Sequence, residues 1–242
     1  MKTPSTKRGI RIAVLSTPSA VAQVPVSAPP SEAEAWEIAK AIMPRFSEYA
    51  DQYDTKKYWP DVYQRVRREF REPTVVGAGT LRDALLWKYG HLGKSAIPPA
   101  HELLISQVQR GWLSAAAALP GTPEDGFVVL DRHFGGKTRF ITVAFLLHLV
   151  YPADVPIIDQ HNFRAVNALL LAVRPRWHSK TRPSLYGDIT LVATFMKVVL
   201  TAWGRRADAS VPTDRELDKF LMMYGKSIKE HRPLQETSVR VR

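Results

Sequence analysis

The chain of 242 residues contains no cysteine. This absence excludes disulfide bridges, cysteine nucleophiles, and thiolate sites for metals or iron–sulfur clusters. It is compatible with a reducing compartment, and we expect a cytoplasmic protein. The chemistry of any site must therefore come from other side chains.

Long apolar runs are also absent. The most apolar segment, "ITVAFLLHLV" at 141–150, has ten residues and is too short to span a bilayer. We therefore expect no membrane partner.

The first 30 residues lack acidic side chains and carry four basic ones, namely Lys2, Lys7, Arg8 and Arg11. The stretch "IAVLSTPSAVA" at 12–22 has the apolar character and small residues of a secretory signal, but Ser16, Thr17, Pro18 and Ser19 interrupt it. We predict a disordered basic tail over residues 1–30 instead.

A β pattern is scarce, because strand-like pieces such as "PTVVGAG" at 73–79 stand alone. Helix signals, in contrast, follow one another along the chain. Ser31 and Glu34 form a capping box, Pro60 suits a first helical turn, and Thr80 and Thr122 are expected N-caps. The predicted helices cover residues 31–46, 60–70, 80–90, 98–118, 122–134, 138–150, 159–173, 186–204 and 213–225.

The fold class predicted from these signals is all-α, with about nine helices in one domain over residues 31–228 and a flexible tail over 229–242. The helix at 138–150 is apolar nearly all round and must be surrounded by protein. We expect two helical lobes around this central buried helix.

Charge is strongly unbalanced, with a formal net charge of +11. Such a surplus favours an acidic partner, most often nucleic acid, although a merely basic soluble protein is the alternative. Residues 174–183, "RPRWHSKTRP", concentrate this charge in Arg174, Arg176, His178, Lys180 and Arg182. They predict either a phosphate-contacting loop or a solvated linker.

The segment "VPIIDQHNFRAVNALL" places Asp159 where an apolar stretch turns into a helix. An aspartate there can be a helix cap, a metal ligand or a catalytic carboxylate. No Glu-x-x-His pair or comparable cluster accompanies it, so we expect neither a metal nor another cofactor.

Residues 125–173 resemble the helix-hairpin-helix DNA glycosylase superfamily, the group of endonuclease III and 8-oxoguanine glycosylase. Members have a glycine hairpin, a buried helix, and a short loop ending in a catalytic aspartate. Here "IDQHNFRAVNAL" at 158–169 is similar to their "VDTHVFRVSNRL". The hairpin "FGGKT" is shorter than usual, and without cysteines the iron–sulfur cluster of endonuclease III is excluded, which favours the 8-oxoguanine glycosylase-like branch.

The resemblance implies that Asp159 is catalytic, a role compatible with capping. A fixed carboxylate near C1′ of the sugar would stabilise the positive charge that builds up as an N-glycosidic bond breaks. Lys137, beside Gly135 and Gly136, has three interpretations: a Schiff-base nucleophile, a phosphate ligand, or a solvated surface lysine.

Further candidates for contacts with DNA are basic or adjacent to the motif. They are Gly135, Gly136, Arg139, His161, Arg164, Arg176, Lys180, Lys88 and Lys94. His161 could equally be a local hydrogen-bonding residue. In "WKYGHLGK" at 87–94, Trp87 and Tyr89 are candidates for stacking on a base, or Trp87 belongs to the core at an ordinary helix end.

These observations together predict a monomeric DNA glycosylase that binds duplex DNA, flips one nucleotide and excises its base, with abasic-site lyase activity if Lys137 is a nucleophile. Oxidised, alkylated, deaminated and hypermodified phage bases remain open as substrates, so repair and antiviral defence are both open. The alternatives are a non-catalytic helical DNA-binding protein and a helical protein-interaction module.

Overall fold

The structure is a computed structural model that describes residues 28–54, 59–136, 139–206 and 210–231. Within these ranges the chain is all-α, as predicted, and nine of its helices have ten or more residues. The helices are α1 (Glu32–Ile42), α2 (Phe46–Ala50), α3 (Pro60–Glu69), α4 (Ala78–Lys88), α5 (Pro99–Ala117), α6 (Pro123–Phe134), α7 (Phe140–Val150), α8 (Gln160–Val173), α9 (Tyr186–Arg206) and α10 (Asp214–His231). Two short 3₁₀ helices, η1 (Met43–Arg45) and η2 (Pro73–Val75), complete the described elements.

Helix ends mostly follow the sequence signals. The capping box of Ser31 and Glu34 is formed, Pro60 opens α3, and Thr122 caps α6. The predicted cap at Thr80 is wrong, because α4 already begins at Ala78 and the Thr80 hydroxyl donates to Glu69 instead. Helix α10 runs on to His231, so the predicted C-terminal tail overlaps its last turn. Nearly all of the predicted N-terminal tail, and residues 232–242, lie outside the described residues.

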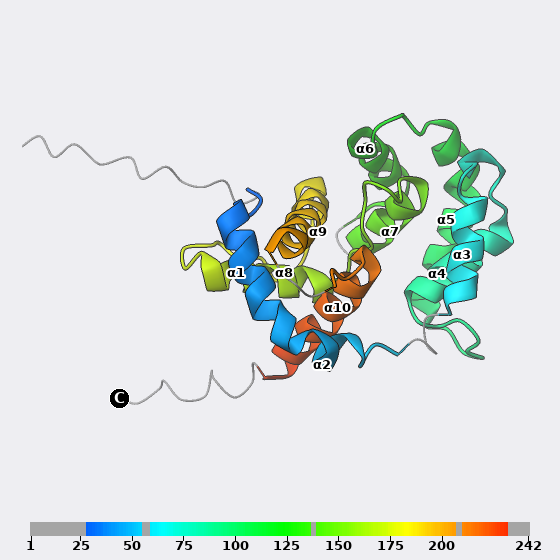
Figure 1. Ribbon diagram of the computed structural model, residues 1–242. Helices are drawn as coiled ribbons and strands as arrows, with labels where there is room; N and C mark the ends of the chain where they lie inside the picture. Colours follow the sequence, from blue (N-terminus) through cyan, green and yellow to red (C-terminus); the bar gives the residue numbers. More distant parts are fainter. Residues whose placement is uncertain (1–27, 55–58, 137–138, 207–209, 232–242) are drawn as a thin grey trace, which may run out of the picture.

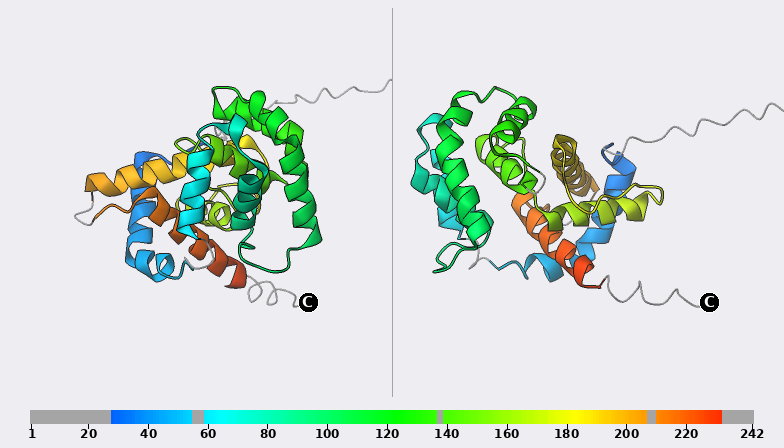
Figure 2. Two further views of the ribbon diagram at one scale, coloured as in Figure 1. Left: turned by 90° about the vertical axis from the view of Figure 1, so that its right-hand side faces the viewer. Right: turned by 180° about the vertical axis from the view of Figure 1, so that it is seen from behind.

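The helices form two lobes (Figures 1 and 2). In the central lobe, α3 to α7 pack largely in sequence order. In the terminal lobe, α10 packs on α8 and α2, and α1 packs on α9 and α8. The two ends of the described chain therefore share one lobe, while the middle of the chain makes the other.

Helix α7 is the buried helix that the sequence predicted, with eight of its eleven residues buried. Helix α9 is also rich in apolar residues. Its segment Tyr186–Arg205 is apolar and long enough to cross a membrane, yet half of it is buried inside the protein. Burial of this kind is what an apolar helix shows in a packed core.

An ion pair fastens the end of α8 to the start of α1. The Arg174 guanidinium donates to both carboxylate oxygens of Glu34, at 2.6 and 2.7 Å, and also to the carbonyls of Ala28 and Pro29. This hydrogen bonding by Arg174 lowers the pKa of Glu34 to about 2. Arg174 therefore has a structural role in the basic loop that it opens.

The contact between α8 and α10 depends on a glycine. A Cβ built on Gly225 would lie 1.9 Å from the carbonyl oxygen of His161, in the first turn of α8. The Arg164 side chain donates to the Gly225 carbonyl at 2.9 Å, which ties the two backbones together at the same place. This close approach positions the start of α8 against α10.

We expect Gly225→Ala to lower the free energy of unfolding by roughly 1–3 kcal/mol or more, because backbone atoms cannot move aside as a flexible side chain can. Gly187→Ala in the first turn of α9 is the matched control, since no atom lies within 4 Å of its added Cβ. The control should be neutral or stabilising by up to about 1 kcal/mol. Urea unfolding of both variants measures the difference, and equal stability would contradict the close packing.

Candidate active site

Asp159 is the N-cap of α8. Its Oδ1 accepts hydrogen bonds from the backbone N–H groups of His161 and Asn162, at 2.7 and 2.9 Å. The Asn162 Oδ1 in turn accepts from the Asp159 N–H at 2.9 Å, so the cap is reciprocal. Both bonds to the carboxylate fall on Oδ1, and no described residue donates to Oδ2. The capping role predicted for Asp159 is thus confirmed, and its catalytic role stays a prediction.

Asn162 connects this cap to α10. Its buried amide donates to the Ile157 carbonyl at 2.7 Å and to Oδ1 of Asp218 at 3.1 Å. Burial raises the pKa of Asp218 to about 6, the hydrogen bond from Asn162 lowers it, and the charge of Asp159 raises it. Neither residue stands out in the sequence, because Asp218 is one acid among several in an amphipathic helix.

Lys88 approaches the same junction from the central lobe. It ends α4, and its Nζ donates at 2.9 Å to the carbonyl of Ile158, the residue before Asp159. The amine also lies 5.5 Å from the centre of the Phe145 ring. Burial lowers the pKa of Lys88, and this effect is opposed by the charges of Asp159 and Asp218.

A pocket of about 550 Å³ opens beside Asp159. We call it the Asp159 pocket. Five residues that the sequence proposed separately line it, namely Lys88, Tyr89, Arg139, Asp159 and His161. The other lining residues are Ala100, His101, Leu103, Leu104, Ile141, Thr142 and Gln160. The first turns of α5, α7 and α8 therefore meet the end of α4 around one cavity.

Tyr89 and His101 form an aromatic wall of this pocket. Their rings stack with centroids 4.2 Å apart and an interplanar angle of 21°. The Tyr89 hydroxyl is hydrogen-bonded to the Thr142 hydroxyl at 2.7 Å, and burial raises the pKa of Tyr89. His101 was not selected from the sequence, since nothing in its helix marks it.

Trp87 does not reach the pocket. Its side chain is 3% exposed and lies between the rings of Tyr63 and Phe145, at centroid distances of 4.9 and 5.8 Å. The proposed base-stacking role of Trp87 is therefore wrong, and the alternative assignment to the core is correct. The reason is that Trp87 and Tyr89 point to different sides of the helix end, one inward and one toward the cavity.

The other residues predicted to contact DNA lie away from the Asp159 pocket. Arg164 bonds α10, as described above. Lys180 donates to both oxygens of the buried Asp188, at 2.6 and 2.8 Å, and so stabilises a buried charge at the start of α9. Arg176 and Lys94 are exposed in loops, where they remain available to a polyanion.

The glycine pair follows α6. Gly135 is the C-cap of that helix, and Gly136 has a φ of +145°, a conformation that side-chain-bearing residues rarely adopt. Lys137 lies outside the described residues, so its three interpretations stand as they were. Arg139 follows closely and is the N-cap residue of α7.

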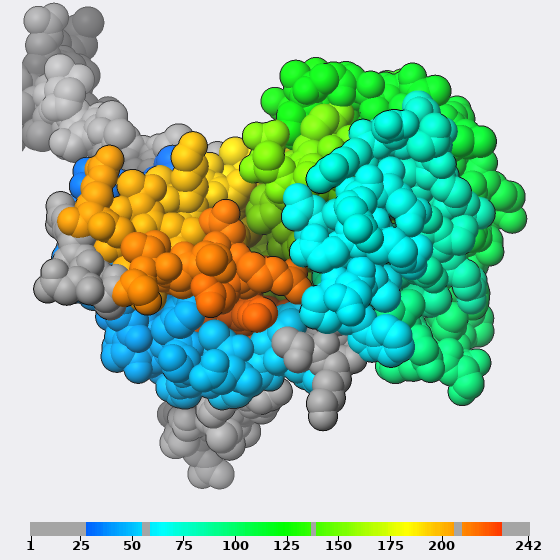
Figure 3. Space-filling model, turned by 45° about the vertical axis from the view of Figure 1, so that its right-hand side comes forward, coloured from blue at the N-terminus to red at the C-terminus, as the bar shows by residue number. Residues whose placement is uncertain are grey.

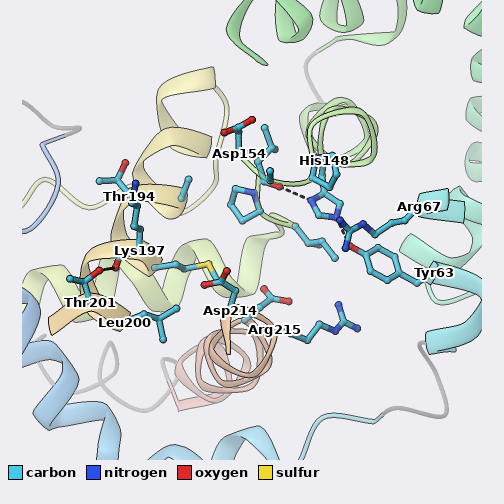
Figure 4. A pocket seen from close by; sticks show the side chains of 18 of the residues that line it. Tyr63, Arg67, His148, Asp154, Thr194, Lys197, Leu200, Thr201, Asp214 and Arg215 are labelled. Carbon is cyan, nitrogen blue, oxygen red and sulfur yellow. Dashed lines mark hydrogen bonds between the residues drawn. The ribbon is translucent and has the colours of Figure 1, made fainter. Parts of the chain in front are cut away.

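A second, larger cavity of about 940 Å³ lies between the lobes and is lined from α3, α9, α10 and the α7–α8 loop. Figure 3 shows the hollow between α10 and α3, and Figure 4 shows its lining. We call it the interlobe cavity. Three basic and three acidic side chains face it, namely Arg67, Lys197, Arg215, Asp154, Asp214 and Asp218.

His148 forms the inner wall of the interlobe cavity (Figure 4). Its Nδ1 is 2.6 Å from the Val155 carbonyl and therefore carries the proton, while Nε2 accepts from the Tyr63 hydroxyl at 2.5 Å. Burial lowers the pKa of His148 to about 4, so the ring is neutral at physiological pH. Among the described residues, no group of three or more histidines and acids is placed to hold a metal ion.

Comparison with known proteins gives no match among family models, curated proteins or solved structures. The comparisons therefore assign this chain to no family.

The raised pKa of Asp218 predicts a pH dependence of stability. Because the folded-state pKa of about 6 lies above the ordinary 3.8, protonated Asp218 contributes stability below about pH 4 that is lost as the pH rises through 6. Asp218→Asn keeps an oxygen acceptor for Asn162 and removes this titration. Relative to wild type, the variant should therefore gain stability between pH 4 and 7, by on the order of 2 kcal/mol.

Thermal melts of both proteins at pH 4, 5, 6 and 7 measure this difference. Glu37→Gln, which removes an exposed carboxylate paired with Lys40 on α1, is the control and should show no such trend. A difference between Asp218→Asn and wild type that does not change with pH would contradict the assignment.

Proposed function

We propose that this protein is a DNA glycosylase that uses Asp159 to excise a base from a flipped nucleotide. The supporting observation is that Asp159 caps a helix through one carboxylate oxygen at the edge of a pocket with an aromatic wall. Five residues that the sequence had indicated separately, including Asp159, line this pocket.

The geometry at Asp159 suits the chemistry of glycosidic bond cleavage. Two backbone N–H groups and the positive end of the α8 dipole hold the carboxylate in one orientation. Its Oδ2, to which no described residue donates, can face a sugar that develops positive charge at C1′, or orient a water molecule for attack. A preoriented charge of this kind needs no reorganisation as the bond breaks.

The Asp159 pocket can hold a flipped base. Its volume of about 550 Å³ is in the range of small-molecule sites. The stacked Tyr89 and His101 rings offer an aromatic surface, and the Arg139 side chain and His161 add polar groups at the pocket wall. Flipping costs a few kcal/mol, which an aromatic wall and phosphate contacts partly offset.

One observation favours the alternative, a helical DNA-binding protein without catalysis. Several motif residues have structural roles: Phe163 is fully buried, Arg164 bonds α10, and Asn167 accepts hydrogen bonds from Trp177 and the Lys180 backbone. A helix with these packing demands could retain the motif for stability alone. Measurement of base release separates the two functions.

Asp159→Asn tests the catalytic role. Asparagine caps a helix nearly as well as aspartate, so stability should change little. The charge that stabilises the sugar cation is lost, and single-turnover base release should fall by on the order of a hundredfold or more. Released base is measured on a panel of DNAs with oxidised, alkylated, deaminated and hypermodified bases.

The panel also identifies the substrate, and a thermal melt accompanies each measurement. Base release at the wild-type rate by a variant that melts like wild type would leave Asp159 with capping alone. If Asp159→Asn unfolds, Asp159→Ser provides a second uncharged cap in which the same loss is expected.

Binding to duplex DNA should be electrostatic, because the net charge is +11. Affinity should fall steeply with salt, with a log–log slope of roughly −0.9 for each phosphate contacted. Arg176→Ala removes an exposed positive charge from the loop after α8. The magnitude of the slope should therefore fall by about 1, the contribution of one phosphate contact. Fluorescence anisotropy between 50 and 200 mM salt tests this, and salt-independent binding would contradict it.

A further inference from the structure

The interlobe cavity contains two arginines that come from different lobes. Arg67 lies on α3 and Arg215 lies on α10, and both side chains are half-buried at the cavity wall. We propose that the interlobe cavity binds a phosphomonoester, whose phosphate group is held between Arg67 and Arg215. This site shares no lining residue with the Asp159 pocket, and the proposal does not depend on the proposed function.

The two guanidinium groups converge on Tyr63. The guanidinium carbon of Arg67 lies 5.8 Å from the centre of the Tyr63 ring, and that of Arg215 lies 5.2 Å from it. Figure 4 shows both side chains beside this ring. Like charges brought together repel each other, and an anion between them offsets that repulsion. The two arginines thus form a cationic pair that bridges the lobes.

The hydrogen-bond donors of both arginines are available to a ligand. Within the part of the chain that the structure describes, no salt bridge joins Arg67 or Arg215 to an acid. Their cationic contacts are with aromatic rings, namely Tyr63 for both and, at 6.0 Å, Tyr53 for Arg215. A planar guanidinium beside a ring keeps N–H donors at its edge, where they suit the oxygens of a phosphate.

Asp218, three positions after Arg215 on α10, is engaged elsewhere. Its Oδ1 accepts a hydrogen bond from the Asn162 amide at 3.1 Å, so this carboxylate bonds to α8. Asp154 and Asp214 also line the cavity, but both are exposed, and water and salt screen their charges. These acids therefore reduce the affinity for an anion without occupying the two arginines.

The inner wall of the cavity experiences both positive charges. Burial is the main cause of the lowered pKa of His148, and the charges of Arg67 and Arg215 lower this pKa as well. Burial raises the pKa of the Tyr63 hydroxyl, and the same two charges oppose that shift. The arginines therefore make the potential at this wall more positive, which favours an anionic ligand.

The size of the cavity indicates a ligand larger than a phosphate ion. Its volume of about 940 Å³ is in the range of sites for small organic molecules. Met196 and Leu200 of α9 supply apolar lining, against which a carbon skeleton can pack. A phosphomonoester carries roughly −1.5 to −2 charges at pH 7, which matches two arginines better than the single charge of a DNA backbone phosphate does.

Calorimetric titration tests the site with three probes, namely inorganic phosphate, deoxyadenosine 5′-monophosphate (dAMP) and deoxyadenosine. We expect saturable binding of the two phosphates and no binding of deoxyadenosine, because the arginines recognise the phosphate group. The dAMP should bind more tightly than inorganic phosphate, because it can also contact the apolar lining. Absence of saturable binding by both phosphates, or equal binding of dAMP and deoxyadenosine, would overturn the proposal.

Variants locate the bound phosphate. Arg67→Gln and Arg215→Gln should each weaken the binding of dAMP by about tenfold or more, because each removes charge-assisted hydrogen bonds. Arg68→Gln is the matched control, since Arg68 is the exposed neighbour of Arg67 on α3, and it should bind dAMP like wild type. Wild-type affinity in both Arg67→Gln and Arg215→Gln would place the phosphate elsewhere and overturn the proposal.

Asp218→Asn should change the affinity in the opposite direction. It removes a negative charge near Arg215, so the binding of dAMP should tighten severalfold at low salt. A general loss of folded protein cannot weaken binding in Arg215→Gln and tighten it in Asp218→Asn. Unchanged or weaker binding by Asp218→Asn would contradict the proposed position of the phosphate. If a glutamine variant unfolds, Arg67→Lys and Arg215→Lys keep the charge, lose the paired donors, and should still bind more weakly.

Competition distinguishes two sources of the phosphomonoester. Bound dAMP is challenged with a short DNA duplex that carries 5′-phosphates and with the same duplex that ends in 5′-hydroxyls. Displacement by the phosphorylated duplex alone would support the site with a DNA end as its ligand, and displacement by neither would support a free small molecule. Equal displacement by both duplexes would indicate binding of backbone phosphodiesters and overturn the proposal.

Discussion

The start of α8 is the junction on which the rest of the structure depends. The Asp159 carboxylate accepts hydrogen bonds from the backbone N–H groups of His161 and Asn162 in the first turn, and the Asn162 side chain continues the network to Asp218 on α10. From the other lobe, Lys88 bonds the carbonyl just before the cap. Because buried polar groups without partners cost free energy, each of these bonds constrains the others.

This junction separates two cavities with different character. The Asp159 pocket combines an aromatic wall with the capped carboxylate and the half-buried Lys88 amine. The interlobe cavity is lined by both basic and acidic side chains, and the neutral His148 forms its inner wall. The charge of Asp218 raises the pKa of Lys88, and the charge of Lys88 lowers the pKa of Asp218.

The motif that suggested a glycosylase is explained in part by packing. Phe163 fills the core, Arg164 fixes α10, and Asn167 holds the loop that carries Trp177 and Lys180. Local sequence could predict the helix start at Asp159, since capping depends on residues within one turn. It could not predict that Lys180 neutralises Asp188 or that Arg174 pairs with Glu34, because those partners depend on how the chain folds back.

The sequence by itself determined the all-α class, most helix ends, the burial of α7, and the cap at Asp159. These properties follow from periodicity and from contacts within a few residues. Only the tertiary structure decided that Trp87 belongs to the core, that Tyr89 faces a pocket, and that Lys88, Asp159 and Asp218 form one electrostatic cluster. Asp159 and Asp218 are 59 positions apart in the sequence, and Lys88 and Asp159 are 71 apart. Their proximity depends on packing between the lobes, which no local pattern encodes.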